Sequence, residues 1–100
     1  MNKNTSLAIV LAVLASTGAA FAYTGQEYAP DAKVTLNQAR ATALNTRHGT
    51  ITNQELERER GGSGLRYSFD IKAHGHTYEV GIDAKTGHIL ENALEGAHPD

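Results

Sequence analysis

The fold of this chain is decided by the stretch YEVGIDAKTGHIL, residues 78–90. Apolar and polar side chains alternate from Tyr78 to Asp83, which is the two-residue period of a strand with one buried face. A compact turn signal follows, in which Asp83 can accept backbone N–H groups and Gly87 can take a positive φ. An apolar segment restarts at Ile89. The stretch therefore predicts a β-hairpin, with Asp83 and Gly87 as structural turn residues.

The preceding segment, Leu65–Ala73, places five apolar side chains on one face of a second strand. His74-Gly75 forms a tight turn between the two strands. Strands joined by so short a turn must be antiparallel. A further strand is expected after the Gly87 turn, at about 88–94.

The charged segment TITNQELERER, residues 50–60, is predicted as a strand at about 51–60. A helix is the alternative, because Glu, Leu and Arg are strong helix formers. The strand is favoured because Gly49 ends a predicted helix just before it and the Gly-rich loop 61–64 follows it.

Within this strand, Ile51 and Leu56 have opposite parity, so one regular strand cannot bury both. A bulge or a late strand start would resolve the conflict. Glu55, Glu57 and Glu59 fall on the opposite face from the bases. We interpret them as solvated acids with Arg and Lys partners across the sheet, and not as catalytic acids.

A helix is predicted at about 36–48. Thr35 and Gln38 form a capping-box pattern at its start, and Gly49 is placed to end it at C′. Its apolar stripe is narrow and rich in alanine, so the helix should lie close against a sheet. The stripe consists of Leu36, Ala39, Ala43 and Leu44.

Together these elements predict an α+β domain at 34–94, in which one amphipathic helix packs on a three- to four-stranded antiparallel sheet. Residues 23–33 are predicted as an extended lead-in and 95–100 as a flexible tail.

Residues 1–22 have the layout of a secretory signal peptide. Lys3 gives the positive start, LAIVLAVLA at 7–15 the apolar core, and Ala20-Phe21-Ala22 the small-x-small cleavage pattern. An uncleaved anchor is the alternative, but the apolar run is short for a bilayer span. A periplasmic or secreted protein is predicted.

Charge argues against a nucleic-acid partner. The chain has 9 basic and 11 acidic residues, and loss of Lys3 leaves 8 basic residues and a net charge of −3. The chain after residue 22 has no hydrophobic segment for membrane insertion. It has no Cys, so it has neither a disulfide nor a cysteine nucleophile. Oligomeric state is left open.

Several short motifs match one known family. They are Thr35-Leu36-Asn37-Gln38-Ala39, Gly49, Leu56-Glu57, Tyr67, Tyr78-Glu79-Val80 and Asp83-Ala84-x-Thr86-Gly87-x-Ile89-Leu90. Together they resemble the PepSY domain, a small module of exported bacterial proteins, over about residues 34 to 92. The resemblance implies a non-catalytic module, without a cofactor, that regulates a peptidase or binds another envelope protein.

The histidines offer a second hypothesis. His74 and His76 flank Gly75, and such a pair could bind a divalent metal, although two imidazoles do not make a closed zinc site. His88 is expected at the far end of the strand, away from this turn. The alternatives are solvent-exposed turn histidines or a small metal- or pH-responsive envelope protein.

Overall fold

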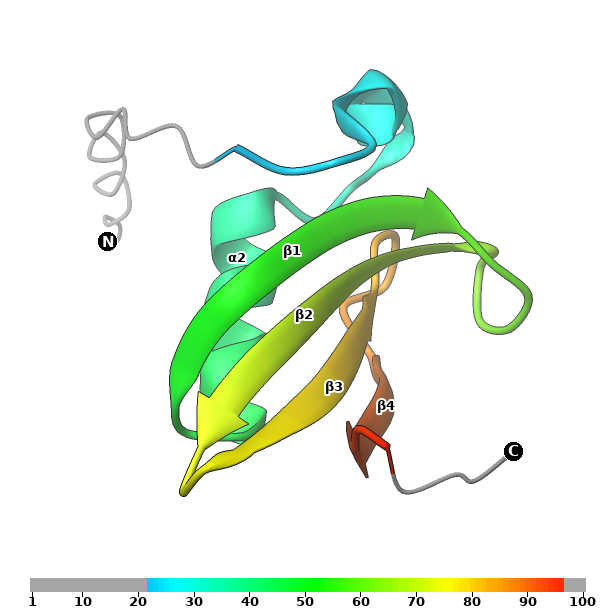
Figure 1. The fold of residues 1–100 in the computed structure, drawn as a ribbon. Coiled ribbons are helices and arrows are strands. Elements are labelled where there is room, and N and C mark those ends of the chain that lie inside the picture. Colours follow the sequence, from blue (N-terminus) through cyan, green and yellow to red (C-terminus); the bar gives the residue numbers. More distant parts are fainter. Residues whose placement is uncertain (1–21, 97–100) are drawn as a thin grey trace, which may run out of the picture.

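A computed structural model describes residues 22–96 of the chain (Figure 1). One α-helix is followed by four antiparallel strands, which form one sheet in the order β1-β2-β3-β4. This confirms the predicted α+β class with a helix followed by a strand meander. The elements are the 3-10 helix η2 (Gln26–Asp31), the α-helix α2 (Leu36–Thr46), and the strands β1 (Thr50–Arg58), β2 (Leu65–Ala73), β3 (His76–Asp83) and β4 (Ile89–Leu94).

Helix α2 begins with the predicted capping box. The Gln38 backbone N–H donates to Thr35 Oγ1 at 3.1 Å, and the Thr35 N–H donates to Gln38 Oε1 at 2.9 Å. The predicted end at Gly49 is wrong, because the helix stops at Thr46 and Arg47 is already extended, with φ −139°. A glycine is needed at position 49 for a different reason, because a Cβ there would lie 2.4 Å from the Lys72 carbonyl oxygen.

The core lies between α2 and one face of the sheet, which Figure 1 shows curving around the helix. Ala39 and Ala43 are fully buried, which confirms the close approach that the alanine stripe predicts. The sheet contributes larger side chains, all of them at most 2% exposed. They are Leu56, Leu65, Tyr67, Phe69, Ile71, Val80 and Ile82.

A bulge in β1 resolves the parity conflict between Ile51 and Leu56. Ile51 pairs with Ile71 and Asn53 with Asp70, so Thr52 is an extra residue on the β1 side. Both apolar side chains of β1 therefore contribute to the core on the helix side.

Residues 22–31 form what we call the N-terminal strap, which lies along the free side of β1. Thr24 makes an isolated parallel bridge with Glu55, and the Leu56 N–H donates to the Thr24 carbonyl at 2.7 Å. Arg58 forms an ion pair with Asp31 at 2.7 Å and stacks 5.0 Å above the Tyr28 ring. The predicted extended lead-in thus includes a 3-10 helix and packs on the domain. Of the predicted signal peptide, residues 1–21 lie outside the described residues, as do 97–100 of the tail.

Because Ala43 is fully buried between helix and sheet, Ala43→Leu should overpack the core. We expect it to destabilise the protein by about 1–3 kcal/mol, seen as a lower Tm in thermal unfolding. The control is Ala41→Leu on the exposed side of the same helix, which should change stability little. Equal effects of the two changes would contradict the close packing of α2 on the sheet.

Candidate functional site

Asp83 is the most elaborately bonded acid in the described part of the chain. Its side chain is 1% exposed and accepts hydrogen bonds from the N–H groups of Ser63 (2.6 Å), Lys85 (2.8 Å) and Thr86 (3.0 Å), and from Ser63 Oγ (2.8 Å). Burial alone would raise its pKa, but these donors outweigh burial and lower it. Gly87 has φ +83°, as the turn pattern predicts. Asp83 therefore ties the β3–β4 turn to the Gly-rich β1–β2 loop, and its oxygens are occupied.

Two of the histidines lie at one turn. His74 lies in the β2–β3 turn with φ +55°, and His76 opens β3 opposite Ala73, both exposed. Within residues 22–96 no three or more His, Asp or Glu residues gather in a way that could hold a metal ion. His88 follows the opposite end of β3, where its carbonyl accepts from the Asp83 N–H. Metal binding by His74 and His76 stays a prediction.

The side of the sheet turned away from α2 is rich in carboxylates, and we call it the acidic face. Burial is the largest cause that raises the pKa of Glu79, and the charges of Glu91, Asp70, Glu57 and Glu95 raise it further. Asp70 lies directly opposite Glu79 in the β2–β3 register, a like-charge pair that opposes folding. These acids therefore repel one another across the strands.

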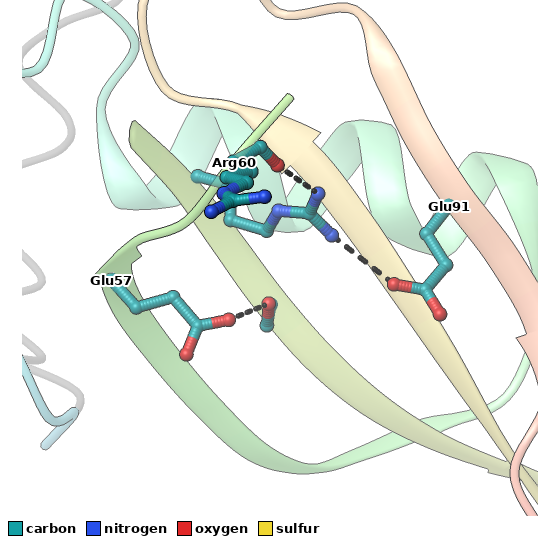
Figure 2. Close-up of polar contacts among 5 residues, drawn as sticks. Glu57, Arg60 and Glu91 are labelled. Atoms are coloured by element: carbon teal, nitrogen blue, oxygen red, sulfur yellow. Dashed lines mark hydrogen bonds and ion pairs between the residues drawn. The ribbon is translucent and has the colours of Figure 1, made fainter. Parts of the chain in front are cut away.

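Arg66 is the base that crosses this face, and Figure 2 labels Arg60 and Glu91, the residues that its guanidinium contacts. Its Nη1 pairs with Glu91 Oε1 at 3.1 Å and its Nη2 donates to the Arg60 carbonyl at 3.5 Å. The side chain is 11% exposed because it lies over Gly81, where a Cβ would come within 2.9 Å of Nη1. Arg66 thus links β2 to β4 across β3 and neutralises one of the acids.

The expected cross-strand partners of the β1 acids differ in detail. Glu57 does lie opposite Arg66, but its carboxylate accepts from Ser68 Oγ at 2.7 Å while Arg66 turns toward β4 (Figure 2). Glu55 lies opposite Ser68 and not opposite a base. Arg66 can reach across β3 because Gly81 has no side-chain carbon in its path. Sequence reasoning did not identify the acidic face.

The two edges of the sheet differ. The strap covers part of β1, whereas β4 pairs with β3 and with no other segment of residues 22–96. β4 also carries two exposed large apolar side chains, Ile89 at 52% and Leu94 at 38%. The strand order β1-β2-β3-β4 thus makes β1 and β4 the two edge strands of the sheet.

The family model described as "Peptidase propeptide and YPEB domain", PepSY, matches residues 33–92. The chain belongs to the PepSY family. The match runs from just before α2 into β4, and the whole strap lies ahead of it. No curated protein and no solved structure gave a match.

PepSY membership is consistent with a non-catalytic module related to peptidase propeptides. Within the described residues, no helix is long and apolar enough to cross a membrane. The chemical groups that this domain presents are accordingly a polar sheet face, a free strand edge and a pair of exposed turn histidines.

Asp83→Asn should destabilise the protein by about 1–3 kcal/mol at pH 7, because an amide cannot accept all the hydrogen bonds that the carboxylate receives. The lowered pKa of Asp83 stabilises the native state above the unfolded-state pKa of about 4, and this contribution is lost as pH falls through the folded-state pKa. The difference between wild type and variant, measured by urea unfolding, should therefore shrink below pH 4. A difference that is constant from pH 7 to pH 2 would contradict this role.

If His74 and His76 bind a metal, calorimetric titration with zinc or copper at pH 7.5 should give heat that disappears in the double variant His74→Ala, His76→Ala. His48→Ala, which removes another exposed histidine, is the matched control and should leave the heat unchanged. Identical heats for wild type and the double variant would end this hypothesis.

Proposed function

We propose that this protein is an exported, non-catalytic regulatory module that binds a peptidase or another protein of the bacterial cell envelope. The observation that carries the proposal is the PepSY match, which spans the helix and almost the whole sheet. The family description links the domain to peptidase propeptides, so a peptidase is the first partner to test.

The predicted signal peptide supports export. Its charged start, apolar core and Ala20-Phe21-Ala22 pattern are those of a cleaved leader, and PepSY domains are typically extracellular or periplasmic. On this proposal the protein meets its partner outside the cytoplasm.

The fold offers a physical route to such binding. An edge strand carries backbone N–H and C=O groups that can pair with an extended segment of another protein. The free edge at β4 is supported from behind by β3 and fixed at one end by the Asp83 turn. Binding at this edge needs no catalytic group from the module.

The proposal is tested by adding the purified protein to an envelope extract and measuring hydrolysis of a casein substrate. We expect a saturable change in peptidase activity, and recovery of the same peptidase on a column of the immobilised protein. Serum albumin at equal concentration is the control. Unchanged hydrolysis at saturation, together with a column that retains no envelope protein, would contradict the proposal.

The second hypothesis, a metal- or pH-responsive protein that uses His74 and His76, depends on the titration described above. Metal binding without any retained protein would favour it.

A further inference from the structure

We infer that the edge of β4 is the docking site, and that its partner is an extended segment whose side chains alternate between basic and apolar. The inference rests on the proposed binding function and specifies its site and the chemistry of its ligand.

The backbone of β4 leaves room for one more strand. Among residues 22–96, β3 is the only segment that pairs with β4, over the register from Tyr78↔Leu94 to Ile82↔Ile89. At the opposite edge, Thr24 already takes the N–H of Leu56. An added strand would therefore find free backbone groups along β4, whereas along β1 it would compete with the strap.

The two sides of β4 differ in polarity. Ile89 and Leu94 lie opposite Ile82 and Tyr78, on the side of α2, and they are the large apolar side chains that remain exposed in the described chain. A neighbouring strand would place every second side chain next to them and remove apolar surface from water. These positions of the partner should be apolar.

On the other side, β4 contributes Glu91 and Ala93, which lie opposite Gly81 and Glu79. Because the side chain of Ala93 is small, a long basic side chain on the added strand can extend past it toward the Glu79 carboxylate. Glu95 follows directly, and its N–H donates to the Thr77 carbonyl at 2.8 Å, which holds it beside β3. The alternate positions of the partner therefore face acids.

Electrostatics favours a cation on this side and not on the other. The pKa of Glu79 is raised by burial and by repulsion from neighbouring carboxylates. An added positive charge would therefore reduce this repulsion. On the helix side, Arg47 already stands 3.8 Å above the Tyr78 ring and donates to Asn92 Oδ1 at 3.2 Å. Basic side chains thus fit the acidic face, and apolar ones fit the helix side.

A second copy of this chain suits the edge poorly. Pairing β4 with its own copy would place the acidic faces of the two sheets side by side, and each brings Glu91 and Glu95. Like charges opposite one another across strands are destabilising. Charge complementarity therefore selects a different, basic chain.

The test titrates the protein, purified after expression of the complete sequence, with acetyl-(Lys-Val)4-amide in a calorimeter, and locates binding by hydrogen exchange. We expect saturable binding that weakens with added salt and protects the amides of β4. The comparison peptides are (Glu-Val)4, which reverses the charge, and (Lys-Pro)4, which keeps the charge but cannot complete a backbone ladder. Neither should bind measurably.

Two double variants with equal charge change separate the edges. Glu79→Gln with Glu95→Gln should weaken binding of the Lys-Val peptide by about threefold to tenfold, as expected for two partly exposed ion pairs. Glu55→Gln with Glu59→Gln, near the strap-covered edge, should leave the affinity unchanged. Thermal unfolding checks that both variants are folded.

Several outcomes overturn the inference. These are no binding of the Lys-Val peptide, equal binding of the charge-reversed or proline peptide, protection at β1 in place of β4, and dimers in sedimentation whose β4 amides are protected without peptide. Each leaves the regulatory function open, because the peptidase assay reports on that independently. Conversely, peptide binding at β4 together with unchanged hydrolysis and no retained envelope protein would contradict the function and retain the site.

Discussion

Only one α-helix in the described chain can cover the sheet, so only one face of four strands is buried. This constraint determines the rest of the structure. Ala39 and Ala43 let the helix approach closely, and the core then consists of large side chains from β1, β2 and β3. The opposite face stays in contact with water and must be polar. Even so, this face gathers several carboxylates around Glu79, which burial of the first face does not require.

The acidic face works against the stability of the isolated domain. Asp70 and Glu79 are direct neighbours across β2 and β3. Arg66 neutralises the charge of Glu91 but forms no ion pair with Asp70 or Glu79. Local arrangements that oppose folding are common at functional surfaces, where a partner supplies the missing interaction. The same face adjoins the strand edge that no other described segment covers. Electrostatic strain and a free backbone edge thus coincide at β3 and β4.

Much of the fold follows from patterns within single elements. The alternation of apolar and polar side chains predicted the strands, and the capping box predicted the helix start. The opposite parity of Ile51 and Leu56 required the bulge that the structure has. The prediction that Gly49 ends the helix was wrong. This position needs a glycine because its backbone lies against the carbonyl of Lys72, a residue more than twenty positions away. Local signals cannot report such a contact.

The acidic face was within reach of the sequence. A tight turn at His74-Gly75 fixes Ala73 opposite His76, and counting back places Asp70 opposite Glu79. The position of Glu91 could not be obtained in this way, because the β3–β4 register shifts between Gly81 and Ile82. Docking of the strap could not be predicted from the sequence either, because it depends on the close approach of Gly25 to the Leu56 carbonyl.

If the protein is exported as proposed, the strap also bears on the order of events during export. The carbonyl of Ala22 accepts a hydrogen bond from Gln54 Nε2 at 3.0 Å, and this carbonyl belongs to the peptide bond that removal of the predicted leader would break. A leader peptidase needs that bond in an accessible, extended chain. Once β1 has formed and the strap has docked, the bond is held against the domain. On the proposal of export, cleavage after Ala22 should therefore come before folding, and Tyr23 would be the first strap residue of the mature chain.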